Sequence, residues 1–232
     1  MTTFALVHGA FHGAWCWDLV RPELESRGHR TVAMDLPCDD PGAGSVRYAE
    51  VVAEAIRDEG DDVIVVGHSL AGLTVPLVAA TRPVARMVFL NAFIPMPGRP
   101  FSEQFGQEGI FPPAPESTWP ITREDGLMTW PPERVIPVLY SDCPGELASW
   151  AAARLRPQST TPHREVCPLT EWPQVPSSYV LSSEDGAVGP DWSRRAARER
   201  LGVTASELHG GHMSMVCHPQ ELADELDRIA HA

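Results

Sequence analysis

The chain has 232 residues, of which 43% are hydrophobic and 21% are charged, as in ordinary globular proteins. Its 31 acidic and 18 basic side chains give a formal charge of −13, which argues against nucleic acids and anionic membranes as partners. We therefore expect a single substantial core and a small, neutral substrate.

The sequence carries no sign of export or membrane insertion. The first apolar run, Phe4–Val7, follows three residues without a basic segment or cleavage site, and no run is long enough to cross a bilayer. The cysteines are odd in number and form no CxxC pair. We expect all five to be reduced thiols in a cytoplasmic protein, with neither a disulfide nor a zinc site: Cys16, Cys38, Cys143, Cys167 and Cys217.

Residues 1–94 alternate short apolar runs with helical patterns. Four runs predict strands buried on both faces, because they lack the polar alternation of half-exposed strands: Phe4–Val7, Arg30–Met34, Val63–Val66 and Arg86–Leu90. Helices are predicted between them, at Trp17–Arg27, Val46–Glu59 and Leu70–Thr81. This order predicts a parallel, doubly wound sheet.

Residues 95–176 interrupt this rhythm. They hold 16 of the 23 prolines and four of the seven tryptophans, too many prolines for long helices and too many aromatic residues for a disordered linker. We expect an inserted cap of short helices and loops, with a proline-rich linker as the alternative.

The sheet resumes after residue 176. Strands are predicted at Ser178–Ser182 and Val203–Leu208, and helices at Asp191–Leu201 and Pro219–His231. The expected architecture is a six-stranded parallel sheet built from residues 1–94 and 177–232, with the cap inserted after the fourth strand.

A nucleophile is indicated by the segment Gly67-His68-Ser69-Leu70-Ala71-Gly72. Ser69 lies directly between a buried strand and a predicted helix, which is the context of a nucleophile elbow. The usual pattern places glycine two residues after the serine, where this chain has Ala71, a residue small enough for such a tight turn. The alternative role for Ser69 is a helix cap.

A serine needs a base, and the base needs an orienting carboxylate. His212 follows a glycine pair after the last predicted strand, and it is preferred over His209 and His218. Asp185 follows the fifth strand next to a glycine; Glu184 should point elsewhere, and Asp191 is the reserve, with a helix N-cap as its simpler role. The order serine, aspartate, histidine is that of the α/β-hydrolase fold.

An oxyanion hole is predicted from two backbone N–H groups. One is that of Leu70, directly after the nucleophile, and the other that of Ala10, in the glycine-containing loop after the first strand. His8 and His12 lie in this loop, where we expect them to hold its shape by hydrogen bonds rather than act as bases.

These residues resemble the plant methylesterase and hydroxynitrile lyase group of α/β-hydrolases and its bacterial esterase relatives. The resemblance is carried by segments at both ends of the chain: Leu6–Trp17, Gly67–Gly72, Ser183–Asp185, Gly211–Met215 and Cys217–Leu222. In the cap it is limited to Leu139-Tyr140 and Leu155–Ser159.

Two positions separate the branches of this family. The lyases that the chain resembles carry a threonine in the first loop and, directly after the histidine, a lysine that stabilises departing cyanide. This chain has Gly9 and Met213 there. Without a cation at Met213, cyanide would leave into a mostly apolar pocket, so the sequence favours an esterase.

We therefore predict a serine esterase that cleaves a small apolar or aromatic carboxylic ester, without a metal or cofactor. Two other functions stay open: a lyase acting on cyanohydrins, and a non-catalytic ligand-binding protein. A homodimer is left open as well. The pocket wall is predicted, with plain core packing as the alternative, at Phe11, Leu70, Trp119, Trp130 and Met213.

Overall fold

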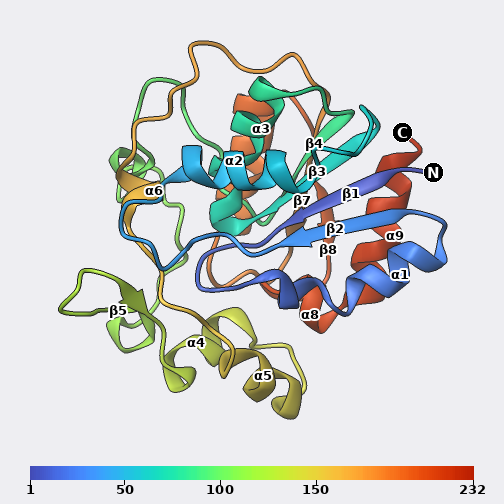
Figure 1. Cartoon of the computed structure of the whole chain (residues 1–232). Coiled ribbons are helices and arrows are strands. Elements are labelled where there is room, and N and C mark those ends of the chain that lie inside the picture. The colour runs from blue at the N-terminus through green and yellow to red at the C-terminus, as the bar shows by residue number, and fades with distance from the viewer.

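A central sheet with helices on both faces makes up most of the molecule (Figure 1). The computed structural model describes all residues, 1–232. All neighbouring strands of this sheet are parallel. Their order is β2 (Arg30–Met34), β1 (Thr3–Val7), β3 (Val63–His68), β4 (Arg86–Leu90), β7 (Ser177–Ser182) and β8 (Ser206–Leu208). The predicted six-stranded parallel sheet is confirmed.

Side chains of the sheet enter two hydrophobic cores, one on each face. Ala5 and Val7 of β1 belong to the core that is completed by α2 (Ser45–Ala55), α3 (Val75–Thr81) and α7 (Pro190–Ala196). Phe4 and Leu6 belong to the core on the other face, with α1 (Val20–Ser26), α8 (Ser214–Cys217) and α9 (Pro219–Ala230). Because both faces are covered, the central strands β1, β3 and β4 are almost wholly buried, as their sequences indicated. The burial on both faces predicted for Arg30–Met34 is wrong, because β2 lies at the edge of the sheet and only Met34 of it is buried.

Several element boundaries differ from the sequence-based expectation. The helix predicted at Leu70–Thr81 starts as a 3₁₀ turn, η2 (Ser69–Leu73), before α3; another such turn, η1 (Ala14–Trp17), precedes α1. The helix after β7 begins at Pro190 and ends in a π turn, η5 (Ala197–Leu201). Gly189 is therefore its N-cap, and the N-cap role considered for Asp191 is wrong.

The chain between β4 and β7 forms short elements beside the carboxyl ends of the strands. The helices α4 and α5 lie below the sheet in Figure 1, away from the two chain termini. The range 95–176 as one cap unit stays a prediction. Its elements are η3 (Phe101–Gln104), η4 (Glu116–Thr118), the hairpin β5 (Ile121–Thr122) and β6 (Met128–Thr129), α4 (Pro132–Leu139), α5 (Gly145–Ala152) and α6 (Thr161–Arg164).

One expectation about the cysteines is wrong. Cys143, just after α4, forms a disulfide with Cys217 at the end of α8, 74 residues further along the chain. The chain between β4 and β7 packs against α8 and brings the two cysteines together, which no spacing rule could anticipate. Cys16, Cys38 and Cys167 are free and buried. With a disulfide present, the cysteines do not support the predicted cytoplasmic location. No helix has the length and apolarity required to traverse a bilayer.

Candidate active site

Ser69 directly follows β3 and is the first residue of η2, in a tight turn between strand and helix. Its φ of 53° lies in the left-handed region, which non-glycine residues rarely adopt. The turn depends on flanking glycines. A Cβ on Gly67 would lie 3.0 Å from the Ala71 carbonyl oxygen, and one on Gly72 would collide with the backbone of Phe93. After the serine, close packing thus requires glycine at position 72 and not at position 71, where the methyl group of Ala71 is buried without conflict.

The loop after β1 lies directly against this serine. A Cβ built on Gly9 would be 2.9 Å from Ser69 Cβ and 2.8 Å from His68 Nδ1. Glycine is therefore needed at position 9 for the close approach of the two segments.

His212 and Asp185 form a buried pair at the carboxyl edge of the sheet. His212 Nδ1 lies 2.7 Å from Asp185 Oδ2, and both residues are at most 3% exposed. The other carboxylate oxygen accepts hydrogen bonds from the backbone of Ala187 and Val188, at 2.7 and 2.9 Å. Asp185 is thus held rigidly, and it fixes a proton on His212 Nδ1, which leaves Nε2 as the basic nitrogen.

Two further residues hold the backbone of His212, and the sequence did not single them out for this. Asn91 directly follows β4, is fully buried and has a φ of 45°. Its amide donates to the carbonyl oxygen of His212 at 3.0 Å and to Ser182 Oγ at 2.9 Å. His68 Nε2 donates to the same carbonyl at 3.1 Å. An asparagine at the end of a buried strand was the available sequence signal.

His68 also sets the electrostatics beside His212. The centres of the two rings are 4.5 Å apart. Burial, with a smaller contribution from His212, holds the pKa of His68 well below its usual value. A neutral His68 places no positive charge beside the ring of His212.

The two N–H groups predicted to form an oxyanion hole are not used in the hydrogen bonding of the chain. Neither the Ala10 nor the Leu70 amide donates a hydrogen bond within the chain. Leu70 is buried at the start of η2, and Ala10 is partly exposed. Two unpaired donors beside a strained serine suit the stabilisation of a developing oxyanion.

His8 and His12 make the loop-holding hydrogen bonds expected of them. His8 Nε2 accepts from the Leu36 amide at 3.0 Å, so Nδ1 carries the proton and donates to the Gly9 carbonyl at 2.8 Å. His12 Nδ1 donates to the Ala10 carbonyl at 2.6 Å. Burial lowers the pKa of His8 to about 4 and that of His12 to about 3, so both are neutral at neutral pH.

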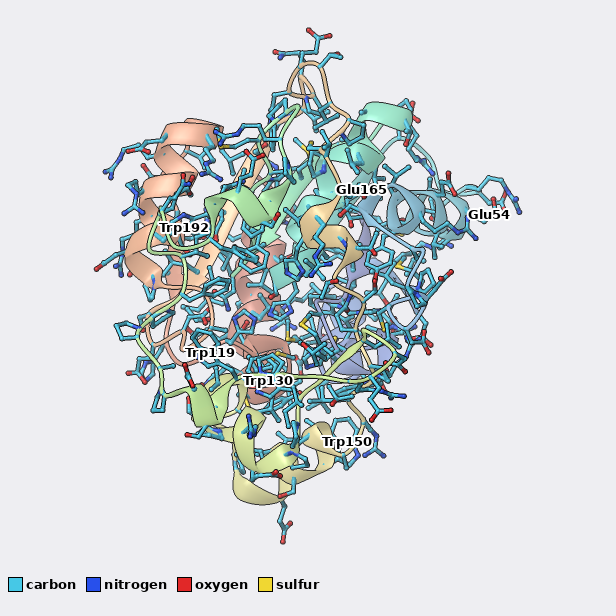
Figure 2. All side chains as sticks on the ribbon, turned by 90° about the vertical axis from the view of Figure 1, so that its left-hand side faces the viewer. Glu54, Trp119, Trp130, Trp150, Glu165 and Trp192 are labelled. Carbon is cyan, nitrogen blue, oxygen red and sulfur yellow. A yellow bond between two sulfur atoms is a disulfide. The ribbon has the colours of Figure 1, made fainter.

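The predicted pocket residues fall into different surroundings. The rings of Phe11 and Trp130 meet edge to face, with centres 5.4 Å apart. Trp119 is 56% exposed, although Figure 2 shows it near Trp130, just above the cap helices. Met213 and Leu70 are buried in the two cores, which agrees with the packing alternative. Their part in a pocket stays a prediction.

A cap residue, Asp142, contacts the histidine loop next to the disulfide. Its Oδ2 accepts from the Gly211 amide at 2.7 Å and lies 2.8 Å from His218 Nε2. With Cys143 and Cys217 it forms the one group of side chains with the spacing of a metal site. Since the two sulfurs are bonded to each other, the group offers no thiolate to a metal in this state.

His209 and Glu184, the less favoured candidates for the base and the carboxylate, lie on the surface. His209 Nδ1 is 3.7 Å from Glu184 Oε1.

Residues 4–225 match the model of the alpha/beta hydrolase family. The chain belongs to this family. It is 31% identical to an alpha-hydroxynitrile lyase of Arabidopsis thaliana and 30% identical to methylesterase 1 of the same plant. Both alignments cover 98% of this chain, with 96% of the lyase and 95% of the methylesterase.

Among solved structures, the pyrethroid hydrolase PytH superposes with a TM-score of 0.84 at 25% identity, over 100% of this chain and 98% of the other. These findings confirm the expected fold and family, and they support an ester hydrolase as the class of enzyme.

Proposed function

We propose that the protein is a carboxylic ester hydrolase that works through an acyl-enzyme on Ser69. The observation that carries this proposal is the buried hydrogen bond between His212 and Asp185, with His212 in contact with His68, the residue that precedes Ser69 in its strained elbow. The hydrolase membership of the chain and the methylesterase relative agree with it.

In the proposed reaction, His212 Nε2 takes the proton of Ser69 Oγ while the oxygen attacks the ester carbonyl. The amides of Ala10 and Leu70 stabilise the negative charge on the carbonyl oxygen. His212 then protonates the departing alcohol, and the acyl group stays on Ser69. A water molecule, deprotonated by His212, releases the carboxylic acid. Asp185 holds the ring and stabilises its protonated form.

The lyase alternative is weakened by two positions. A threonine at position 9 would bring its Cβ within 2.9 Å of Ser69 Cβ, so one of the two segments would have to shift. Met213 has no exposed surface and no charge, and it offers departing cyanide no cationic partner. We therefore favour ester cleavage, of a small apolar or aromatic ester, although one relative is a lyase.

Hydrolysis of p-nitrophenyl acetate tests the proposal. We expect turnover by the natural chain and a loss of at least about three orders of magnitude in kcat for Ser69→Ala and for His212→Gln. His209→Gln is the matched control, because His209 is an exposed histidine three residues from His212. It should keep the natural rate.

Three outcomes would count against the proposal. Equal rates for the natural chain and Ser69→Ala would exclude this nucleophile. Cyanide release from mandelonitrile at a higher rate than ester cleavage would favour the lyase. If the protein cleaves no ester and a fluorophosphonate does not label Ser69, the remaining function would be that of a non-catalytic ligand-binding protein.

A further inference from the structure

The loop that carries the Ala10 amide is held in a conformation that it would not keep unaided. Phe11, the next residue, has a φ of 66°, a region that disfavours a bulky side chain. Such a conformation persists only where the surroundings over-determine it. The position of the Ala10 N–H therefore depends on what contacts residues 10–12.

Two of these contacts come from the segment Leu155–Ser159. The Arg156 amide donates to the Phe11 carbonyl at 2.7 Å. The Phe11 amide in turn donates to Gln158 Oε1 at 3.2 Å. Gln158 has no exposed surface, and its Nε2 donates to Tyr48 Oη at 3.2 Å and to the Ser159 carbonyl at 2.9 Å. Gln158 is thus held by hydrogen bonds of its own, and it fixes the Ala10–Phe11 peptide.

A second cap segment reaches the same loop through a histidine. Tyr140, 1% exposed, lies just after α4, and its hydroxyl is 2.7 Å from His12 Nε2. Because the Ala10 carbonyl can only accept, His12 Nδ1 must carry the proton, and neutral His12 accepts from the tyrosine at Nε2. The Tyr140 hydroxyl thereby fixes the tautomer in which His12 binds Ala10.

We propose that Tyr140 and Gln158 are positioning residues that set the oxyanion hole, so that the cap shapes the catalytic loop besides covering it. This inference rests on the proposed function of the Ala10 amide. It also gives a role to the only two cap segments that resemble the esterase family, Leu139-Tyr140 and Leu155–Ser159. They are the two segments that supply these contacts.

The experiment compares Tyr140→Phe and Gln158→Met with the natural chain. Loss of an oxyanion donor costs about 10²- to 10³-fold in kcat, and a displaced donor should cost about 10- to 100-fold. KM for p-nitrophenyl acetate should change less than threefold. A boronic acid forms a tetrahedral adduct on serine, and its affinity should fall by the same factor as kcat, which a merely structural role would not produce.

Gln104→Met is the matched control. Gln104 is also a cap glutamine, 2% exposed, and its Oε1 accepts from Arg200 instead of from the catalytic loop. This variant should keep kcat and boronate affinity within threefold. Hydrogen exchange measured by NMR adds a readout independent of turnover: the Arg156 amide, bonded to Phe11, should exchange at least about tenfold faster in both test variants.

The two proposals can fail separately. If the natural chain cleaves no ester, the proposed function fails, and the exchange of the Arg156 amide still decides whether Tyr140 and Gln158 hold the loop. Unchanged exchange in both variants overturns the inference. So does a fall in kcat that leaves the boronate affinity at its natural value.

Discussion

The disulfide between Cys143 and Cys217 should contribute a large part of the stability of the fold. It closes a loop with a sequence separation of 74 residues. The disulfide restricts the unfolded chain, and for a loop of that length the lost entropy stabilises the folded state by about 4 kcal/mol at 25 °C. For a chain of this size each kcal/mol moves Tm by about 2–4 °C, so opening the disulfide should lower Tm by about 8–16 °C.

Thermal unfolding with and without a phosphine reductant measures this effect. The double variant Cys143→Ser/Cys217→Ser should melt near the reduced natural chain, and the reductant should not change its Tm. Thiol titration in denaturant should find three free thiols before reduction and five after it. Five thiols before reduction, or a reductant effect below about 1 °C, would refute the reasoning.

Further predictions concern the site and its surroundings. Asn91→Leu keeps the side-chain size but removes the hydrogen bond to the His212 carbonyl. The kcat for p-nitrophenyl acetate should fall at least about tenfold with little change in KM. An unchanged kcat would contradict a positioning role for Asn91. Gly72→Ala should cost about 1–3 kcal/mol in urea unfolding, because its methyl group has no space, and a neutral effect would contradict the elbow packing. The low pKa values of His8 and His12 mean that the unfolded chain binds protons below pH 6.5 that the folded chain does not. At pH 5 each should lower the free energy of unfolding by about 2 kcal/mol relative to pH 7.5, and equal stability at both pH values would argue against their burial as neutral groups.

The fold could be predicted because its signals are local. Apolar runs such as Val63–Val66 mark strands covered on both faces, and turn and helix patterns between them set a parallel order. The candidates Ser69, Asp185 and His212 follow the same logic, since each lies within four residues of the end of a strand.

Contacts between distant segments left no comparable signal. Asn91 follows a buried strand and Gln158 lies in a segment that resembles the esterase family, but only the folded chain shows that they and Asp142 contact the loops of His212 and Ala10. The disulfide escaped prediction for the same reason, because Cys143 and Cys217 meet only after the cap has packed on α8.

The disulfide has a consequence for proteolysis. A single cut anywhere in residues 144–216, for example in the exposed turn at Glu171, would produce two fragments that stay covalently joined. Asp185 and His212 both lie within this range, so neither could be lost by diffusion after such a cut. A nicked protein should therefore run as two bands only under reducing conditions, and it can keep its site assembled while the peptide chain is interrupted.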